Sequence, residues 1–437
     1  MNIFIFCGPL AFGKGGMEKV AASLANFLSD KNIVTVGFFC RESQTLPAYD
    51  LNKYVLKAPW FFREQESRNV YLKRILESSP DVFIYFGASS QIIQVISLLY
   101  GCDVPIIIHE GSNPERVITT NWASAKRISR YEAAWERELI YSQASAIRFT
   151  VPEYLSSLPS SSLKNKAFAF PNAFTSCYKI SKRPMLKRIV NVGGLKPNKN
   201  LKPLIFAFSD VVKHFPDWEL HIFSAKNRFS AGDVYIKELE ELVDSLCLSN
   251  NVFFRGEVKD MDSEFIDSDI HVITSLSEGL SNAVAEAMVN GVPTIGIEEV
   301  PGVSCLIKNN INGILVDRAN LVFELFEALF SLISNEGLKN SLSDQARMDS
   351  NIFNPEEIYL RWLELIDFSV SKVSRECDNA SFHYSQMVRA LYSSQVQGFE
   401  GQIEGKKYKE NMNNALNKRR DINLIEMSAN DNRWIND

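Results

Sequence analysis

The chain has 437 residues, 46% of them hydrophobic, and a formal net charge of −5, which predicts a globular protein with more than one domain. This acidic balance gives no electrostatic reason to expect a nucleic-acid partner. The seven cysteines are scattered without a CxxC pair, so the sequence indicates neither a zinc site nor a disulfide framework and fits a reducing compartment.

Neither a leader nor a membrane span is expected. The first residues are apolar but lack a basic region and a cleavage-like end, so they predict a first strand rather than a signal peptide. Apolar runs stay well short of the ~18 uninterrupted residues expected of a membrane-spanning helix. We therefore expect a cytoplasmic protein.

Short apolar runs alternate with helical patterns through the first part of the chain. A helix is predicted over 17–28, where one face is apolar. The runs are continuous, as in parallel strands buried on both faces, so they predict a doubly wound α/β sheet. The first domain is expected to end at residue 172, before a polar, basic linker. The predicted strands are 2–7, 34–39, 82–86, 104–109 and 147–151.

A second alternation follows and predicts a second domain over 173–353, with a helix over about 234–248. A further helix is expected over 354–369, opening at Asn354-Pro355. The segment 370–437 is polar and contains a basic cluster. We interpret it as a solvated or disordered tail, with membrane-surface contact as the other option. The predicted strands of the second domain are 188–192, 220–223, 252–254, 270–274, 294–297 and 314–316.

The most informative segment is 275–293, SLSEGLSNAVAEAMVNGVP. It follows a predicted strand and contains a tight loop, then a helix capped by Ser281 or Asn282 that ends at Asn290-Gly291. Glu278 in the loop and Glu286 on the helix are eight residues apart, about two helical turns, so both acids can face one side.

The chemistry of these acids points to a polar ligand. Glu286 stands among small apolar side chains, where a carboxylate is unfavourable unless something hydrogen-bonds to it. The backbone N–H groups at the helix N-terminus suit an anion. Together these features predict a crevice that holds an anion beside hydroxyl groups, which is the shape of a nucleotide-sugar.

This ordered pattern resembles the E-x7-E signature of retaining glycosyltransferases of family 4, which have the GT-B fold. The resemblance covers about 1–367. It implies two Rossmann-like domains facing a central crevice, with the helix over 354–369 crossing back onto the first domain. A surface helix with a solvated glutamate would explain neither Glu286 nor the Glu-Gly loop. The matching residues are Ser275, Glu278-Gly279, Glu286-Ala287-Met288 and Gly291-Val292-Pro293.

The resemblance also implies roles for these residues. Glu278 would contact hydroxyls of the transferred sugar, and Glu286 the ribose hydroxyls. Gly279, Leu280 and Ser281 would offer backbone N–H groups to the sugar and phosphate.

His109 stands at the carboxyl end of a predicted strand, where ligands bind in open α/β sheets. The family's histidine at this place reaches the transferred sugar, and imidazole can hydrogen-bond a hydroxyl while neutral. A structural histidine is the alternative.

The segment 191–200, NVGGLKPNKN, resembles the family's pyrophosphate-binding element. Lys199 matches its lysine, but Gly194, next to Gly193, stands where the family has arginine. Lys196 is close enough to compensate. We expect Lys199 and the helix N-terminus to stabilise the leaving group, with a surface lysine as the alternative.

The Gly-rich start of the chain resembles the family's Gly-Gly loop, which helps to position donor and acceptor. Gly15, Gly16 and Glu18 match it, and a tight strand–helix turn is the alternative. Residues 8–14 also spell G-x4-G-K, but Gly15 replaces the hydroxyl residue with which a phosphate-binding loop holds magnesium.

Other features concern metals and membranes. Asp267-Ser-Asp269 spells D-x-D, which we interpret as structural. The resemblance implies no cofactor and no essential metal. Basic residues alternate with aromatic ones over 57–63 and 122–137, a pattern that suits a membrane or a lipid-linked acceptor, although a core helix with a solvated face also explains it.

The sequence thus predicts a retaining hexosyltransferase that uses a nucleotide-sugar, with a UDP-sugar favoured. The acceptor would be a glycan or an undecaprenyl-diphosphate-linked glycan in surface-polysaccharide or lipopolysaccharide biosynthesis, at the inner face of the cell membrane. The acceptor and setting rest on family analogy alone. The alternatives are a non-catalytic nucleotide-sugar-binding protein of the same fold and a P-loop-like nucleotide hydrolase.

Overall fold

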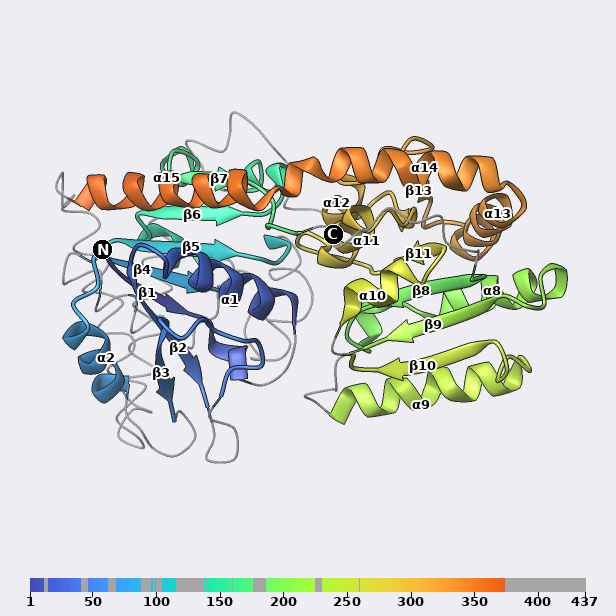
Figure 1. Cartoon of the computed structure of the whole chain (residues 1–437), viewed down its shortest axis with the longest axis horizontal. Helices are drawn as coiled ribbons and strands as arrows, with labels where there is room; N and C mark the ends of the chain where they lie inside the picture. The colour runs from blue at the N-terminus through green and yellow to red at the C-terminus, as the bar shows by residue number, and fades with distance from the viewer. Residues whose placement is uncertain are drawn as a thin grey trace, which may run out of the picture.

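The computed structural model describes residues 1–11, 15–40, 46–61, 68–87, 96, 99, 104–114, 137–138, 140–158, 160–175, 186–224, 230–258 and 260–373. Two α/β domains lie side by side, each built on one parallel sheet (Figure 1). This arrangement confirms the predicted GT-B architecture.

The N-terminal sheet has seven strands in the order β3-β2-β1-β4-β5-β6-β7. Its order reverses between β1 and β4, and such switch points form ligand crevices at the carboxyl ends of the strands. The strands are β1 Asn2–Phe6, β2 Ile33–Phe39, β3 Leu56–Trp60, β4 Val82–Phe86, β5 Ile106–Glu110, β6 Ala146–Phe149 and β7 Ala167–Ala169. The described helices of this domain are η1 Gly8–Ala11, α1 Gly16–Leu28, α2 Arg68–Glu77, η4 Pro152–Leu155 and α7 Ser161–Lys164.

The C-terminal sheet has six strands in the order β10-β9-β8-β11-β12-β13, with the reversal between β8 and β11. The strands are β8 Arg188–Val192, β9 Glu219–Phe223, β10 Val252–Gly256, β11 Ile270–Val272, β12 Thr294–Ile297 and β13 Gly313–Val316. The helices are η5 Pro197–Lys199, α8 Lys202–His214, α9 Ser230–Ser245, α10 Met261–Ile266, α11 Asn282–Val289, α12 Pro301–Ser304, α13 Leu321–Ser334, α14 Glu336–Asp349 and η6 Ser350–Phe353.

Helix α15, Pro355–Val373, leaves the C-terminal domain and packs on the N-terminal sheet against β4, β5 and β6 (Figure 1). Its buried residues Ile358, Trp362 and Ile366 join the core formed by β1 and α1. The helix runs four residues beyond the predicted end at 369. The remainder of the predicted tail, 374–437, lies outside the described residues.

Strand β3 was not predicted from the sequence. Its packing argues against one proposed membrane contact. Trp60 is fully buried and stacks on Tyr71, with ring centroids 4.6 Å apart. Lys57 is exposed on the same strand, so the basic–aromatic pattern is that of an edge strand with one buried face. Trp60 therefore cannot serve as a surface anchor. Residues 62 and 63 lie outside the described part.

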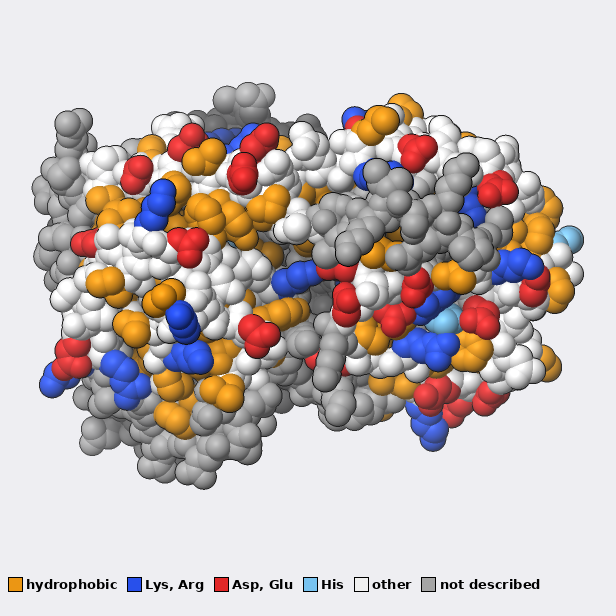
Figure 2. All heavy atoms as spheres, in the orientation of Figure 1, with side chains coloured by type: hydrophobic (Ala, Val, Ile, Leu, Met, Phe, Trp, Pro, Cys, Tyr) orange, Lys and Arg blue, Asp and Glu red, His pale blue; other side chains and the backbone are white. Residues whose placement is uncertain are grey.

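The second basic–aromatic stretch, 122–137, is described only at its last residue. Arg137 is buried and forms an ion pair with Glu110, so its charge does not face a membrane. Among the described residues, no helix is both long and apolar enough to cross a membrane. Acidic and basic side chains are interspersed over the face shown in Figure 2.

Candidate active site

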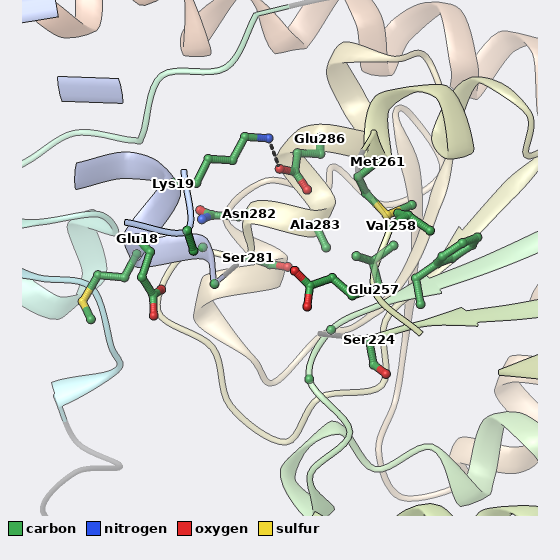
Figure 3. Close-up of a pocket in the computed structure, with 18 of the residues that line it drawn as sticks. Glu18, Lys19, Ser224, Glu257, Val258, Met261, Ser281, Asn282, Ala283 and Glu286 are labelled. Carbon is green, nitrogen blue, oxygen red and sulfur yellow. Dashed lines mark hydrogen bonds and ion pairs between the residues drawn. The ribbon is translucent and has the colours of Figure 1, made fainter. Parts of the chain in front are cut away.

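A cleft of about 780 Å³ lies between the two domains, at the carboxyl ends of their strands. Residues 15–19 line it from the N-terminal domain. From the C-terminal domain it is lined by Gly193, Lys199 and the first turn of α11. Figure 3 shows Ser281, Asn282 and Ala283 beside the cleft. Its volume falls within the range of about 300–1,000 Å³ that is usual for small-molecule sites.

Helix α11 begins as predicted. Ser281 is its N-cap and accepts a hydrogen bond from Val284 N at 3.4 Å, and Gly291 follows the helix with a positive φ of 68°. Ser281, Asn282 and Ala283 all line the cleft, so the positive end of the helix faces it.

One predicted donor is not available to a ligand. We expected Ser281 to offer its backbone N–H, but that group donates to Gly302 O at 2.8 Å. The cause is the close approach of α12, since a Cβ at Gly302 would overlap Gly279 O. Gly279 is also confined, because a Cβ there would overlap Gly111 O of the other domain. The loop therefore needs glycine to let three backbone segments meet.

Glu278 and Lys199 form an ion pair inside the C-terminal domain. Lys199 Nζ lies 2.6 Å from Glu278 Oε1, and both side chains are largely buried. The loop that carries Glu278 is held against η5, because Leu276 N donates to Asn198 O at 2.9 Å. Lys199 also passes Gly193, where an added Cβ would lie 3.0 Å from Lys199 Cε.

At Gly194, where the family has arginine, the backbone leaves room for a side chain. An added Cβ would meet only Lys196 Cε, at 3.8 Å. Lys196 also lines the cleft. The second lysine therefore lies beside the place that the missing arginine would occupy.

Glu286 forms an ion pair across the domain interface. Lys19 Nζ, from α1, lies 2.6 Å from Glu286 Oε1 (Figure 3). Burial raises the pKa of Glu286, Lys19 opposes that rise, and Asp262 adds to it. The partner that a carboxylate in apolar surroundings requires is thus a lysine 267 residues away in the sequence.

The Gly-Gly loop lies where α1 approaches α11. A Cβ at Gly16 would overlap Asn282 Nδ2, so a larger residue there would displace the Asn282 amide. Gly15 O accepts from Tyr49 OH at 3.2 Å, and Glu18 is buried beside Gly15. Gly13 and Lys14 lie outside the described residues.

His109 ends β5 and is buried, with only 1% of its surface exposed. Arg148 Nη1 lies 2.9 Å from His109 Nδ1, and burial together with the Arg148 charge holds the pKa of His109 well below its ordinary value. Gly111, two residues further on, lines the cleft, and an added Cβ there would lie 3.1 Å from His109 Nε2. His109 therefore lies directly behind the cleft wall.

Asp269 of the D-x-D sequence forms a buried ion pair with Lys339 at 2.9 Å, which agrees with its structural interpretation. Among the described residues, no group of three or more His, Cys, Asp or Glu side chains could hold a metal ion.

Several residues absent from the sequence prediction connect the two domains. Asn172 Nδ2 donates to Asn282 Oδ1 at 2.9 Å. Tyr154 OH donates to Glu278 O at 2.6 Å. Arg148 could have been suspected, because an arginine inside the apolar run 147–151 must find partners. Tyr154 and Lys19 carry no comparable signal.

The fold and the interdomain cleft define a protein of the GT-B class, and the comparisons agree. Residues 178–349 match the family model described as Glycosyl transferases group 1. An uncharacterized glycosyltransferase of Haemophilus influenzae is 25% identical over 361 residues, which is 80% of this chain and 95% of that protein.

A second relative has a named substrate. The GalNAc-alpha-(1->4)-GalNAc-alpha-(1->3)-diNAcBac-PP-undecaprenol alpha-1,4-N-acetyl-D-galactosaminyltransferase of Campylobacter jejuni is 23% identical, covering 80% of this chain and 95% of that protein. The structure of Anabaena Alr3699/HepE in complex with UDP and glucose superposes with a TM-score of 0.66 at 16% identity, covering 84% of this chain and 99% of that one. The solved structure shows the GT-B fold, the family match lies within the C-terminal domain, and the named relatives support transferase activity.

Proposed function

We propose that this protein is a retaining glycosyltransferase that moves a sugar from a nucleotide-sugar, with a UDP-sugar favoured, to a glycan or lipid-linked glycan. The observation that carries the proposal is the interdomain cleft, in which Glu278, Lys199, Glu286 and the N-terminus of α11 meet. Such a site offers cationic, anionic and backbone groups to one ligand within a volume suited to it.

Lys199 and the start of α11 would hold the donor diphosphate. An ammonium group and a helix N-terminus both favour negative charge, which increases on the leaving phosphate during transfer. This arrangement supplies the stabilisation without a metal, and we propose that none is essential. The missing arginine at Gly194 leaves Lys199, with Lys196 beside it, as the cationic side of the cleft.

The two carboxylates would bind hydroxyl groups. Glu286 would accept hydrogen bonds from the ribose, and Glu278 from the transferred sugar. In the present arrangement each carboxylate contacts a lysine, so the donor must compete with Lys19 and Lys199 for these acids.

Transfer with retention requires the acceptor hydroxyl to approach the face from which the diphosphate leaves. The bond from the anomeric carbon to the phosphate oxygen breaks, the bond to the acceptor oxygen forms, and the acceptor proton passes to the departing phosphate. Closure of the domains over the donor would exclude water and limit hydrolysis.

The relatives support the choice of substrates. The Anabaena structure contains UDP and glucose, and the name of the Campylobacter enzyme specifies an undecaprenyl-diphosphate-linked acceptor. We extend both to this chain: a UDP-sugar donor and an undecaprenyl-diphosphate-linked acceptor in surface-polysaccharide synthesis, reached from the inner face of the membrane.

A thermal-shift panel of UDP-, GDP-, ADP- and dTDP-sugars and ATP, with and without magnesium, tests the donor. Stabilisation by a UDP-sugar without magnesium is expected. Stabilisation only by ATP with magnesium would overturn the proposal in favour of a nucleotide hydrolase. Transfer to an undecaprenyl-diphosphate-linked glycan, with the product's anomeric configuration determined by NMR, then tests catalysis. Donor binding without turnover would favour a non-catalytic protein, which the glycine at 194 makes the second candidate.

A further inference from the structure

Arg148 is a buried cation with an unusual set of partners. It lies in the middle of β6 with 0% of its surface exposed. Its hydrogen bonds all go to neutral acceptors: His109 Nδ1 and Asn172 Oδ1 at 2.9 Å, Phe170 O at 2.8 Å and Pro171 O at 2.6 Å. Its Nε has no partner among the described residues.

A buried guanidinium without a carboxylate is costly, so its position calls for a reason. Its carbon lies 4.5 Å from the Phe170 ring centroid and 5.0 Å from that of Trp362, and these ring faces offset part of the cost. Burial lowers the pKa of Arg148 to about 9, which still leaves the group charged at neutral pH.

The contact with His109 settles which proton the imidazole carries. A guanidinium has only donors, so His109 Nδ1 must accept the hydrogen bond and cannot carry a proton. The ring is then neutral with its hydrogen on Nε2. Of the ring atoms, Nε2 would lie nearest to a Cβ added at Gly111, one of the residues that line the cleft.

The other described side chains around His109 are aromatic or already paired. Phe86 from β4 and Trp362 from α15 face the ring, with centroids 4.6 Å and 6.1 Å away. Arg148 from β6 is the charged group that acts on it. Glu110, the next residue along, is occupied by Arg137 and Ser112.

Arg148 also reaches the donor side of the cleft. Its Nη1 contacts Asn172 Oδ1, and Asn172 in turn donates to Asn282 on the first turn of α11. The same guanidinium therefore orients a residue behind the cleft wall and a link to the helix that would hold the phosphate.

We propose that Arg148 is a positioning residue that holds His109 as a neutral imidazole with its hydrogen on Nε2, so that a hydrogen-bond donor rather than a base lies behind the cleft wall. This inference rests on the proposed function for its catalytic consequence, but the tautomer is a property of the protein without substrate.

The first test is ¹⁵N NMR of the histidine side chains in the wild-type protein, with His109→Gln used to assign the His109 signal among the five histidines. We expect a protonated Nε2 and an unprotonated Nδ1 with no titration between about pH 5 and about pH 8. A proton on Nδ1, or titration near the ordinary histidine pKa of about 6.5, would overturn the proposal. This measurement requires no Arg148 variant to fold.

The second test compares Arg148→Lys with Arg148→Met. Lysine keeps a donor-only charge and should retain the tautomer, whereas methionine should free Nδ1 to take a proton and should lower kcat/KM about tenfold or more. The control is Arg188→Met, which removes a partly buried arginine that pairs with Glu264 in the other domain and should leave the His109 signals unchanged.

The pH profile separates a positioning role from simple loss of structure. In Arg148→Met the pKa of His109 should rise, because the Arg148 charge is gone, but should stay below its ordinary value because burial remains. The pH profile of kcat/KM should therefore acquire an ionisation on the acid side that is absent from Arg148→Met/His109→Gln. The same profile in both variants would overturn the role of Arg148 in positioning His109. The expected tautomer with no transfer from any nucleotide-sugar would instead count against the proposed function.

Discussion

The two carboxylates of the cleft each pair with a lysine, but one lysine belongs to the same domain and the other to the opposite domain. Glu278 and Glu286 each hold a lysine Nζ at 2.6 Å. Lys199 belongs to the same domain as Glu278, so that pair can form without the other domain. Lys19 belongs to the opposite domain, so the pair with Glu286 exists only when the domains are together. One acid is pre-organised, whereas the environment of the other depends on domain closure.

Of the substitutions that test this comparison, removal of Lys199 should change activity most. Lys199→Ala is expected to lower kcat about 100-fold or more, because the leaving diphosphate loses its principal cation. Initial rates with saturating donor measure the effect. Lys202→Ala, which removes an exposed lysine paired with Glu238, is the matched control and should stay near the wild-type rate. A Lys199→Ala rate within about twofold of wild type would assign the leaving-group role elsewhere.

The nucleotide without its sugar distinguishes the two acids. Glu286→Ala should weaken UDP binding about tenfold or more, because ribose hydroxyls lose a charged acceptor. Glu278→Ala should leave UDP binding unchanged or tighten it, because Lys199 is freed for the phosphate. Calorimetric titration of both variants measures the difference. Equal weakening of UDP binding in both variants would show that the acids do not bind separate parts of the donor, the ribose at Glu286 and the sugar at Glu278.

Because Lys19 pairs with Glu286 across the domains, the Tm of Lys19→Met should depend on pH. Burial raises the folded-state pKa of Glu286, so its charge destabilises the fold at neutral pH, and this penalty is relieved as the pH falls through the folded pKa toward the unfolded value. Lys19 reduces the penalty. The Tm deficit of Lys19→Met should therefore be greatest at about pH 7 and shrink toward about pH 5.

The Glu286→Gln background is the control for that experiment. Adding Lys19→Met to it should produce a Tm change that does not vary with pH, since the titrating group is gone. If the deficit of Lys19→Met in the wild-type background were equally insensitive to pH, the interdomain pair would not govern the charge of Glu286.

Tyr154→Phe should have the smallest effect. Its hydroxyl donates to Glu278 O from the other domain, and losing this hydrogen bond should reduce the free energy of unfolding by about 1 kcal/mol. Urea unfolding measures the change, with Tyr54→Phe at an exposed position as the control. Identical stability of the two variants would remove Tyr154 from the interface argument.

Most strands of the two sheets could be predicted from the sequence because they depend on local pattern. Continuous apolar runs mark parallel strands covered on both faces, and Ser281, Asn290 and Gly291 delimit α11. Strand β3 was not predicted because Lys57 and Pro59 interrupt its apolar character, which an edge strand permits. The Ser281 N–H was assigned to a ligand because the approach of Gly302 cannot be seen locally.

By itself, the sequence determined the loop and helix that carry the two carboxylates, because they lie in a short contiguous motif whose geometry follows from backbone rules. The role of Lys199 as a cation for phosphate stays a prediction from the resemblance. Only the tertiary structure decided which groups those residues meet. Lys19 reaches Glu286 and Arg148 reaches His109 across 267 and 39 residues of sequence. Such contacts depend on how two sheets and their connecting helix pack, and burial within that packing raises the pKa of Glu286 and lowers that of His109.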